Sequence, residues 1–149
     1  MSQIRITKEF SFEMAHALKG HDGPCRFIHG HSYKLSVTLV GNPIMDDTSP
    51  RLGMVMDFGE MKKIVHENII RIFDHALVLN RNSILEENDK IPELFEKMLI
   101  VDYQPTSENL LLDFVYRIRP LLPSNASLHS MKLRETATAY AEWFATEND

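Results

Sequence analysis

Two stretches of alternating side chains constrain the fold of this chain more than any other feature of its sequence. Residues 4–14 and 32–39 place apolar side chains mainly at one parity and polar side chains at the other. The apolar positions are Ile4, Ile6, Phe10, Phe12, Met14, Tyr33, Leu35, Val37 and Leu39. A period of two predicts strands with one buried face. The glycine- and proline-containing residues 20–24 between the two stretches predict a connecting loop.

Two helices are predicted in the middle of the chain. Asp57 can cap the first, with Glu60 three residues on, and apolar residues follow at helical spacing as far as Phe73. The sequence Pro-Thr-Ser at residues 105–107 opens the second helix. The segment 81–104 between them reads as irregular, although a short helix can form at 92–99.

The end of the chain reads as a final β-hairpin, formed by residues 127–135 and 138–145. The order of elements predicts an α+β domain, with a four-stranded antiparallel sheet and two helices on one face. A length of 149 residues fits a single domain over residues 1–149. The sheet would keep two exposed edges, which assembly of several copies could cover.

Composition excludes several classes of function. The formal net charge of −5 argues against nucleic acid as the main partner, although a local basic pocket could still bind an anionic small molecule. No apolar run approaches the ~20 residues that span a bilayer, and we expect no secretory signal at the N-terminus. The single cysteine cannot form an intrachain disulfide. We therefore expect a soluble, cytoplasmic protein.

Three histidines are predicted to meet at one end of the first hairpin. His16 shares the parity of the apolar residues at the end of the first strand, and His29 and His31 share it at the start of the second. In an antiparallel hairpin, all three imidazoles point off the same face. Three neutral imidazoles suit Zn²⁺ and leave one coordination position open, as in catalytic sites. The alternative is that these are ordinary surface or core histidines.

The lone cysteine lies in the loop that joins these strands, four residues before His29. A nearby Zn²⁺ and the adjacent Arg26 would lower the pKa of the Cys25 thiol and favour the reactive thiolate. Two other interpretations remain open: Cys25 is a small buried apolar residue, or it is a fourth zinc ligand that closes the site.

Two further sets of polar residues are candidates for the same site. Asp74 and His75 follow the first helix, and a histidine held by a carboxylate can carry protons for a cysteine enzyme. Glu135 shares the parity of the apolar Met131 and Leu133, so it is predicted to point inward. Its partner there is either a basic side chain or the guanidine-like edge of a ligand such as a 2-amino-4-oxo pterin.

These residues together resemble the family of 6-pyruvoyl-tetrahydropterin synthases and 6-carboxytetrahydropterin synthases. The resemblance covers nearly the whole chain in order. The matching pieces are residues 12–16 (FEMAH), 25–31 (CRFIHGH), 56–58 (MDF), 74–75 (DH), 105–109 (PTSEN) and 135–138 (ETAT).

The resemblance implies a tunnelling fold (T-fold), in which subunits join their sheets into a barrel and two trimers stack as a homohexamer. It implies zinc on His16, His29 and His31. It also implies that active sites lie between subunits.

The same resemblance implies roles for the remaining candidates. Cys25 is the proton acceptor, and Asp74 and His75 complete the proton-transfer set. Glu135 anchors the pterin ring, with Thr106 and Ser107 beside it.

The spacing from Cys25 to His29 is the short form seen in bacterial 6-carboxytetrahydropterin synthases, which favours the 7-deazaguanine (queuosine) branch. The expected function is that of a zinc-dependent lyase converting 7,8-dihydroneopterin triphosphate to 6-carboxytetrahydropterin, acetaldehyde and triphosphate. One alternative is triphosphate elimination alone, giving 6-pyruvoyl-tetrahydropterin. Another is a non-catalytic zinc- or pterin-binding protein, against which the intact Cys25, Asp74 and His75 argue. The segment 81–104 is longer than in the compact bacterial form.

Overall fold

The first hairpin forms the centre of the structure, a computed structural model that describes residues 2–83 and 94–149. Strand β1 (Ile4–His16) pairs antiparallel with β2 (His29–Gly41) over thirteen residues each. The register places His16 opposite His29, and Met14 opposite His31. The alternation in the sequence therefore predicts this hairpin correctly, including which residues share a face.

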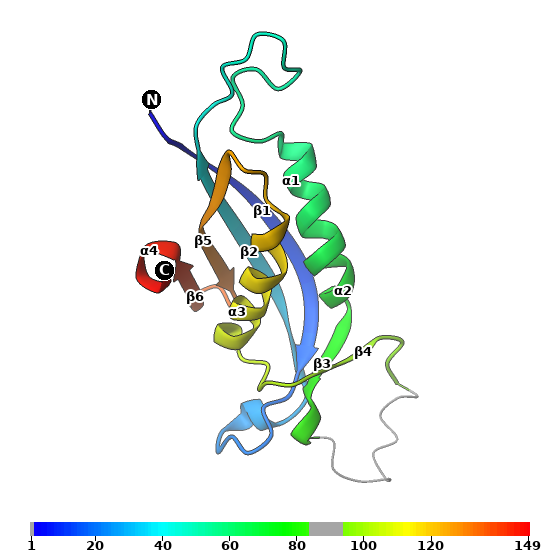
Figure 1. Ribbon diagram of the computed structural model, residues 1–149. Coiled ribbons are helices and arrows are strands. Elements are labelled where there is room, and N and C mark those ends of the chain that lie inside the picture. Colours follow the sequence, from blue (N-terminus) through cyan, green and yellow to red (C-terminus); the bar gives the residue numbers. More distant parts are fainter. Residues whose placement is uncertain (1, 84–93) are drawn as a thin grey trace.

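The hairpin lies within a six-stranded mixed sheet of order β4-β3-β1-β2-β5-β6 (Figure 1). On one side, β2 pairs antiparallel with β5 (Ala126–Arg134), which pairs with β6 (Tyr140–Phe144). On the other side, β1 pairs parallel with β3 (Ala76–Asn80), and β3 pairs parallel with β4 (Met98–Val101).

The prediction of four antiparallel strands is therefore wrong in both number and direction. The two extra strands are short and mostly apolar, Ala-Leu-Val-Leu followed by Asn80 in β3 and Met-Leu-Ile-Val in β4. Such strands carry no alternation because both faces are covered, as is usual for parallel strands. Leu77 and Leu79 indeed pack with Ala17 in a small apolar cluster separate from the main core. The prediction of a short helix at 92–99 is also wrong, because residues 98–99 belong to β4. Residues 92–93 of that range lie outside the described residues.

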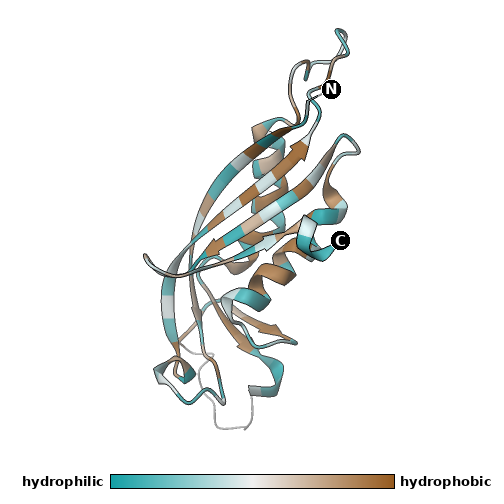
Figure 2. Ribbon diagram, turned by 90° about the vertical axis from the view of Figure 1, so that its left-hand side faces the viewer, coloured by the Kyte–Doolittle hydropathy of each residue, from teal (hydrophilic) through white to brown (hydrophobic). Residues whose placement is uncertain are grey.

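Two helical segments cover one face of the curled sheet (Figure 1). The first consists of α1 (Phe58–Val65), a π-helical turn (His66–Ile70) and α2 (Arg71–Phe73); the second is α3 (Ser107–Ile118). Their apolar stripes meet the inward residues of β1, β2 and β5 in the main core, and brown and teal alternate along the strands in Figure 2. The rings of Phe12, Phe73 and Phe114 join sheet and helices there by edge-to-face contacts. Short 3₁₀ turns at Pro24–Arg26, Arg81–Ser83 and Arg119–Leu121 and a terminal helix α4 (Ala145–Asn148) complete the elements.

Both predicted helix starts are found. The Asp57 carboxylate accepts hydrogen bonds from the backbone N–H groups of Gly59 and Glu60, and Thr106 caps α3. Glu60 pairs with Arg51 and does not reach back to the cap, so the capping box is incomplete. Within residues 2–83 and 94–149, no helix combines the length and apolar character needed to cross a bilayer.

Candidate metal and pterin site

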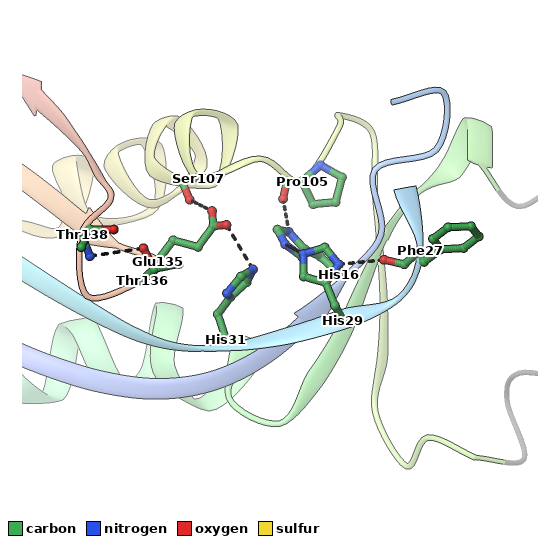
Figure 3. Close-up of polar contacts among 9 residues, drawn as sticks. All are labelled: His16, Phe27, His29, His31, Pro105, Ser107, Glu135, Thr136 and Thr138. Atoms are coloured by element: carbon green, nitrogen blue, oxygen red, sulfur yellow. Dashed lines mark hydrogen bonds and ion pairs between the residues drawn. The ribbon is translucent and has the colours of Figure 1, made fainter. Parts of the chain in front are cut away.

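The hairpin brings the three histidines together at the end of the core nearest the N-terminus of α3 (Figure 3). One ring nitrogen from each of His16, His29 and His31 lies within 4.8 Å of the other two. The closest pair, Nε2 of His16 and Nε2 of His29, is 3.1 Å apart. Two nitrogens on one tetrahedral zinc ion, each at about 2.0–2.1 Å, are about 3.4 Å apart. The cluster is therefore of the right size for one small cation.

Two backbone carbonyls determine which ring nitrogen of His16 and of His29 carries the proton. Nδ1 of His16 donates to the oxygen of Pro105 at 2.7 Å, and Nδ1 of His29 donates to the oxygen of Phe27 at 2.7 Å (Figure 3). When neutral, both rings then carry a lone pair on Nε2, and these lone pairs face one another at 3.1 Å. This arrangement is repulsive without a cation between the rings, whereas histidine metal ligands commonly donate their other N–H to a carbonyl. The donor set fits a metal ion.

Burial favours the neutral, metal-binding form of His16 and His31. His16 is 1% exposed, and burial lowers its pKa despite the opposing effects of the Pro105 hydrogen bond and the Glu135 charge. Burial also lowers the pKa of His31, against the attraction of Glu135 and with a further contribution from His29. Both histidines are therefore less readily protonated than a free histidine, which favours metal binding near neutral pH.

Glu135 points into the same space from the end of β5, as its parity predicts. Its Oε1 lies 3.1 Å from Nε2 of His31, and its Oε2 accepts a hydrogen bond from the Ser107 hydroxyl (Figure 3). No arginine or lysine pairs with this carboxylate among the described residues. The ion pair with an arginine or lysine considered from the sequence is thus not found in the part of the chain that the structure describes. A carboxylate that is only partly satisfied by protein groups can accept hydrogen bonds from a ligand.

Cys25 lies in the 3₁₀ turn at residues 24–26, within the loop between β1 and β2. It is half-buried, and its carbonyl accepts a hydrogen bond from Leu18 N–H at 3.0 Å. The group of candidate ligand atoms found within the described ranges consists of the three imidazoles and does not include the Cys25 thiol. The cluster by itself therefore offers three protein ligands.

Asp74 and His75 are held together, but away from the imidazoles. Oδ1 of Asp74 lies 3.0 Å from Nδ1 of His75 and accepts the backbone N–H of Glu13 at 2.9 Å. Burial raises the pKa of Asp74, but hydrogen bonds from Glu13 and His75 outweigh it and leave the pKa lowered. The His75 side chain is 78% exposed, on a backbone with φ of 60°.

His75 lines an open depression of about 310 Å³. The walls include Glu13, Gly30 and Ser32, whose parity in β1 and β2 places them on the sheet face opposite the three imidazoles, and His31 borders the same depression. The described residues contain no hydrogen bond between Cys25 and either Asp74 or His75.

The N-terminus of α3 contributes contacts that the sequence only partly predicts. Ser107 is buried, and its hydroxyl donates a hydrogen bond to Glu135. Thr106 uses its hydroxyl to accept the N–H of Asn109 at 3.2 Å, which is a capping role. The sequence offers no sign of the Pro105 carbonyl, because every residue carries a backbone carbonyl. It also offers no sign of Tyr33, whose buried hydroxyl beside His31 has no hydrogen-bond partner in the described part of the chain.

Comparison with known proteins identifies the family of this chain. The family model described as 6-pyruvoyl tetrahydropterin synthase matches residues 5–146. The chain belongs to this family. A family relative from Haemophilus influenzae, named 6-carboxy-5,6,7,8-tetrahydropterin synthase, is 34% identical over 94% of this chain and 98% of its own length.

Solved structures support the same fold. An uncharacterised protein from Wolinella succinogenes superposes with a TM-score of 0.79 at 21% identity, covering 97% of this chain and 99% of that one. The 6-pyruvoyl tetrahydropterin synthase of Caenorhabditis elegans superposes with a TM-score of 0.68 at 23% identity, covering 97% of each chain. The family's T-fold is thus built here on six strands of mixed direction.

Proposed function

We propose that this chain is a zinc-dependent 6-carboxytetrahydropterin synthase of the 7-deazaguanine (queuosine) pathway. It would convert 7,8-dihydroneopterin triphosphate and water to 6-carboxytetrahydropterin, acetaldehyde and triphosphate. The observation that carries the proposal is the pairing of a three-histidine cluster with the carboxylate of Glu135 in one site. The relative from Haemophilus influenzae, which carries that name, is aligned over nearly the full length of both chains.

Glu135 binds the substrate's pterin ring in this proposal. A carboxylate matches the adjacent N–H groups of a 2-amino-4-oxo pterin through two parallel hydrogen bonds. The Ser107 hydroxyl holds one carboxylate oxygen, which limits rotation of the side chain and fixes the ring plane. The side chain of the substrate then extends from Glu135 toward the imidazoles.

The histidines would hold the metal beside the side chain of the substrate. When bound there, Zn²⁺ supplies a Lewis acid to a substrate oxygen. The hydrogen bonds of His16 and His29 to backbone carbonyls keep both Nε2 atoms aimed at the ion. Cys25, in the loop between the two strands that carry the ligands, accepts the proton removed from the substrate carbon.

Asp74 and His75 return a proton in this proposal, and they do so from a neighbouring subunit. The dyad is exposed beside Glu13 and shares no hydrogen bond with Cys25 within the described parts of one chain. An assembly that joins the sheets of several copies would bring the dyad of one chain to the thiol of the next. The carboxylate of Asp74 stabilises the charged imidazole and fixes its orientation.

The alternative product is 6-pyruvoyl-tetrahydropterin, formed by triphosphate elimination without cleavage of a carbon–carbon bond. The four-residue step from Cys25 to His29 favours the carboxy product, as does the name of the Haemophilus relative. A non-catalytic zinc- or pterin-binding protein would use the histidines and Glu135, but it would have no need for Cys25, Asp74 or His75.

One incubation distinguishes these functions. Purified protein loaded with Zn²⁺ is mixed with 7,8-dihydroneopterin triphosphate, and acetaldehyde is measured together with the mass of the pterin product. Acetaldehyde in step with 6-carboxytetrahydropterin supports the proposal. Release of triphosphate with 6-pyruvoyl-tetrahydropterin and no acetaldehyde supports the alternative, and unchanged substrate with measurable pterin binding supports a binding protein.

A further inference from the structure

The Pro105 carbonyl that orients His16 sits in a tightly tied turn before α3. The N–H of Thr106 donates to the carbonyl of Gln104 at 2.8 Å, closing a three-residue turn around Pro105. The side-chain amide of Asn109 donates to the same Gln104 oxygen at 3.0 Å. Proline restricts φ to about −65°, so this turn has little freedom. The Pro105 oxygen is left pointing out of the turn, at Nδ1 of His16 (Figure 3).

Gln104 also reaches the loop that carries the cysteine. Its side-chain Nε2 donates to the carbonyl of Lys19 at 3.0 Å, across 85 residues of sequence. The neighbouring Leu18 donates its backbone N–H to the carbonyl of Cys25 at 3.0 Å. One amide side chain thus connects the turn behind the metal ligand His16 to the loop that positions Cys25.

We infer that Gln104 and Asn109 are positioning residues that hold the Pro105 carbonyl on His16 and set the Cys25 loop relative to it. Neither has a hydrogen bond to the imidazoles or to Glu135 within the described residues, so neither is assigned contact with metal or substrate. The inference rests on the proposed function in that it assumes a metal on the histidines and a working thiol at Cys25. It gives a role to Asn109, the last residue of the Pro-Thr-Ser-Glu-Asn sequence, which has no role in the proposed function.

The two residues predict different defects. Asn109→Asp preserves the shape but removes the donor to Gln104, so the Pro105 carbonyl is held less firmly by the Thr106 N–H bond alone. Loss of an outer hydrogen bond to a ligating histidine typically costs 10- to 100-fold in metal affinity, and we expect about tenfold for this indirect case. Gln104→Glu likewise removes the donor to Lys19, and we expect kcat to fall while KM for the pterin changes less than twofold, because Glu135 and Ser107 keep their contact.

Asn125→Asp is the matched control. Asn125 also donates a side-chain amide to a distant backbone carbonyl, that of Val55 at 2.8 Å, but at the other end of the sheet. Zn²⁺ affinity of the full-length variants is measured by competition with a chromophoric chelator, and unfolding in urea gives the stability of each. Asn109→Asp should bind Zn²⁺ about tenfold more weakly than Asn125→Asp at comparable loss of stability.

Three outcomes would overturn the inference. The first is equal Zn²⁺ affinity in Asn109→Asp and Asn125→Asp. The second is an unchanged kcat in Gln104→Glu. The third is a loss of metal affinity that follows the loss of stability in all three variants. Failure of the proposed function is seen separately, because the wild-type chain would then bind no Zn²⁺ or convert no pterin. Restoring a donor with Asn109→Gln, which is longer by one methylene, should recover part of the metal affinity if the hydrogen bond to Gln104 is what matters.

Discussion

His31 is the metal-ligand candidate that also contacts Glu135, the proposed pterin-binding residue. Its Nε2 is buried and lies 3.1 Å from the Glu135 carboxylate, while its ring stands edge-on to those of His16 and His29. One side chain therefore links the two halves of the site. Substitutions that change only the histidine cluster or only Glu135 are therefore the most informative tests of the site.

Replacing a histidine should remove the metal and leave the fold intact. In His31→Ala, two imidazoles remain, which is fewer than the three protein ligands of a catalytic zinc site. We expect less than one tenth of the wild-type zinc content by atomic absorption after dialysis, with an unchanged circular dichroism spectrum. His129→Ala, on β5 and outside the cluster, should retain full zinc content. Full zinc in His31→Ala would show that the cluster is not the metal site.

Glu135 should contribute the charge that binds the pterin ring. Glu135→Gln preserves size and loses the charge, so pterin affinity should weaken by about 1.5–3 kcal/mol, the range for hydrogen bonds to charged groups. Isothermal calorimetry with a non-reacting pterin measures this directly. Glu142→Gln on β6 removes an exposed carboxylate and should bind the pterin normally. Equal affinity of both variants with the wild type would assign Glu135 another purpose.

Cys25 should act as a base and not as a ligand. Cys25→Ala is expected to keep its zinc and its pterin affinity, because the thiol is outside the group of ligand atoms. Turnover should fall by about 10²–10⁴-fold, as is typical for loss of one acid–base group. Zinc content and kcat are measured on the same samples of Cys25→Ala and wild-type protein and compared. Zinc lost in proportion to activity would make Cys25 a ligand and contradict the mechanism.

At the scale of elements, alternation in the sequence predicts the parts of the fold that have one buried face. It correctly gives β1, β2 and the β5–β6 hairpin, and helical spacing gives the two long helices. It fails for β3 and β4, because strands covered on both faces have no periodic signal. The same division holds for the site: the histidines and Glu135 follow from parity, whereas the contact of Ser107 with Glu135 depends on how α3 docks.

The docking of α3 should depend strongly on one ring. Phe114 is fully buried and contacts Phe12 and Phe73 at centroid distances of 6.1 and 4.9 Å. Phe114→Ala should lower the free energy of unfolding by about 3–5 kcal/mol, measured in urea, because it leaves a cavity between helices and sheet. Leu112→Ala, on the exposed side of the same helix, should change it by about 0.5 kcal/mol or less. Similar effects for both would mean that α3 is not anchored through Phe114.

At the scale of the whole molecule, the curled sheet ends in two short strands, β4 and β6. In the described chain, β4 pairs only with β3, and β6 pairs only with β5. Open edges of this kind invite pairing with another chain. His75 of the dyad is 78% exposed, as the proposed sharing of a site between subunits requires.

The chain is therefore expected to assemble as a homohexamer, a dimer of trimers. Light scattering at micromolar concentration should give six times the chain mass of 17.2 kDa. Mixing Cys25→Ala chains with His75→Ala chains should restore part of the activity, because some sites then combine an intact thiol with an intact dyad from different subunits. A monomeric mass, or no recovery from the mixed variants, would contradict a shared site.

The π-helical turn at His66–Ile70 takes up one additional residue within the first helix. The N–H of Arg71 bonds to the carbonyl of His66, five residues back, so this turn holds one residue more than an α-helix would need. An unabsorbed extra residue would turn everything after it by about 100°, the rotation per residue of an α-helix. Because the wider turn absorbs it, deleting one residue here should regularise the helix and leave Asp74 beside the Glu13 N–H that holds it. The first helix could therefore gain or lose one residue at this turn without displacing the dyad from the sheet.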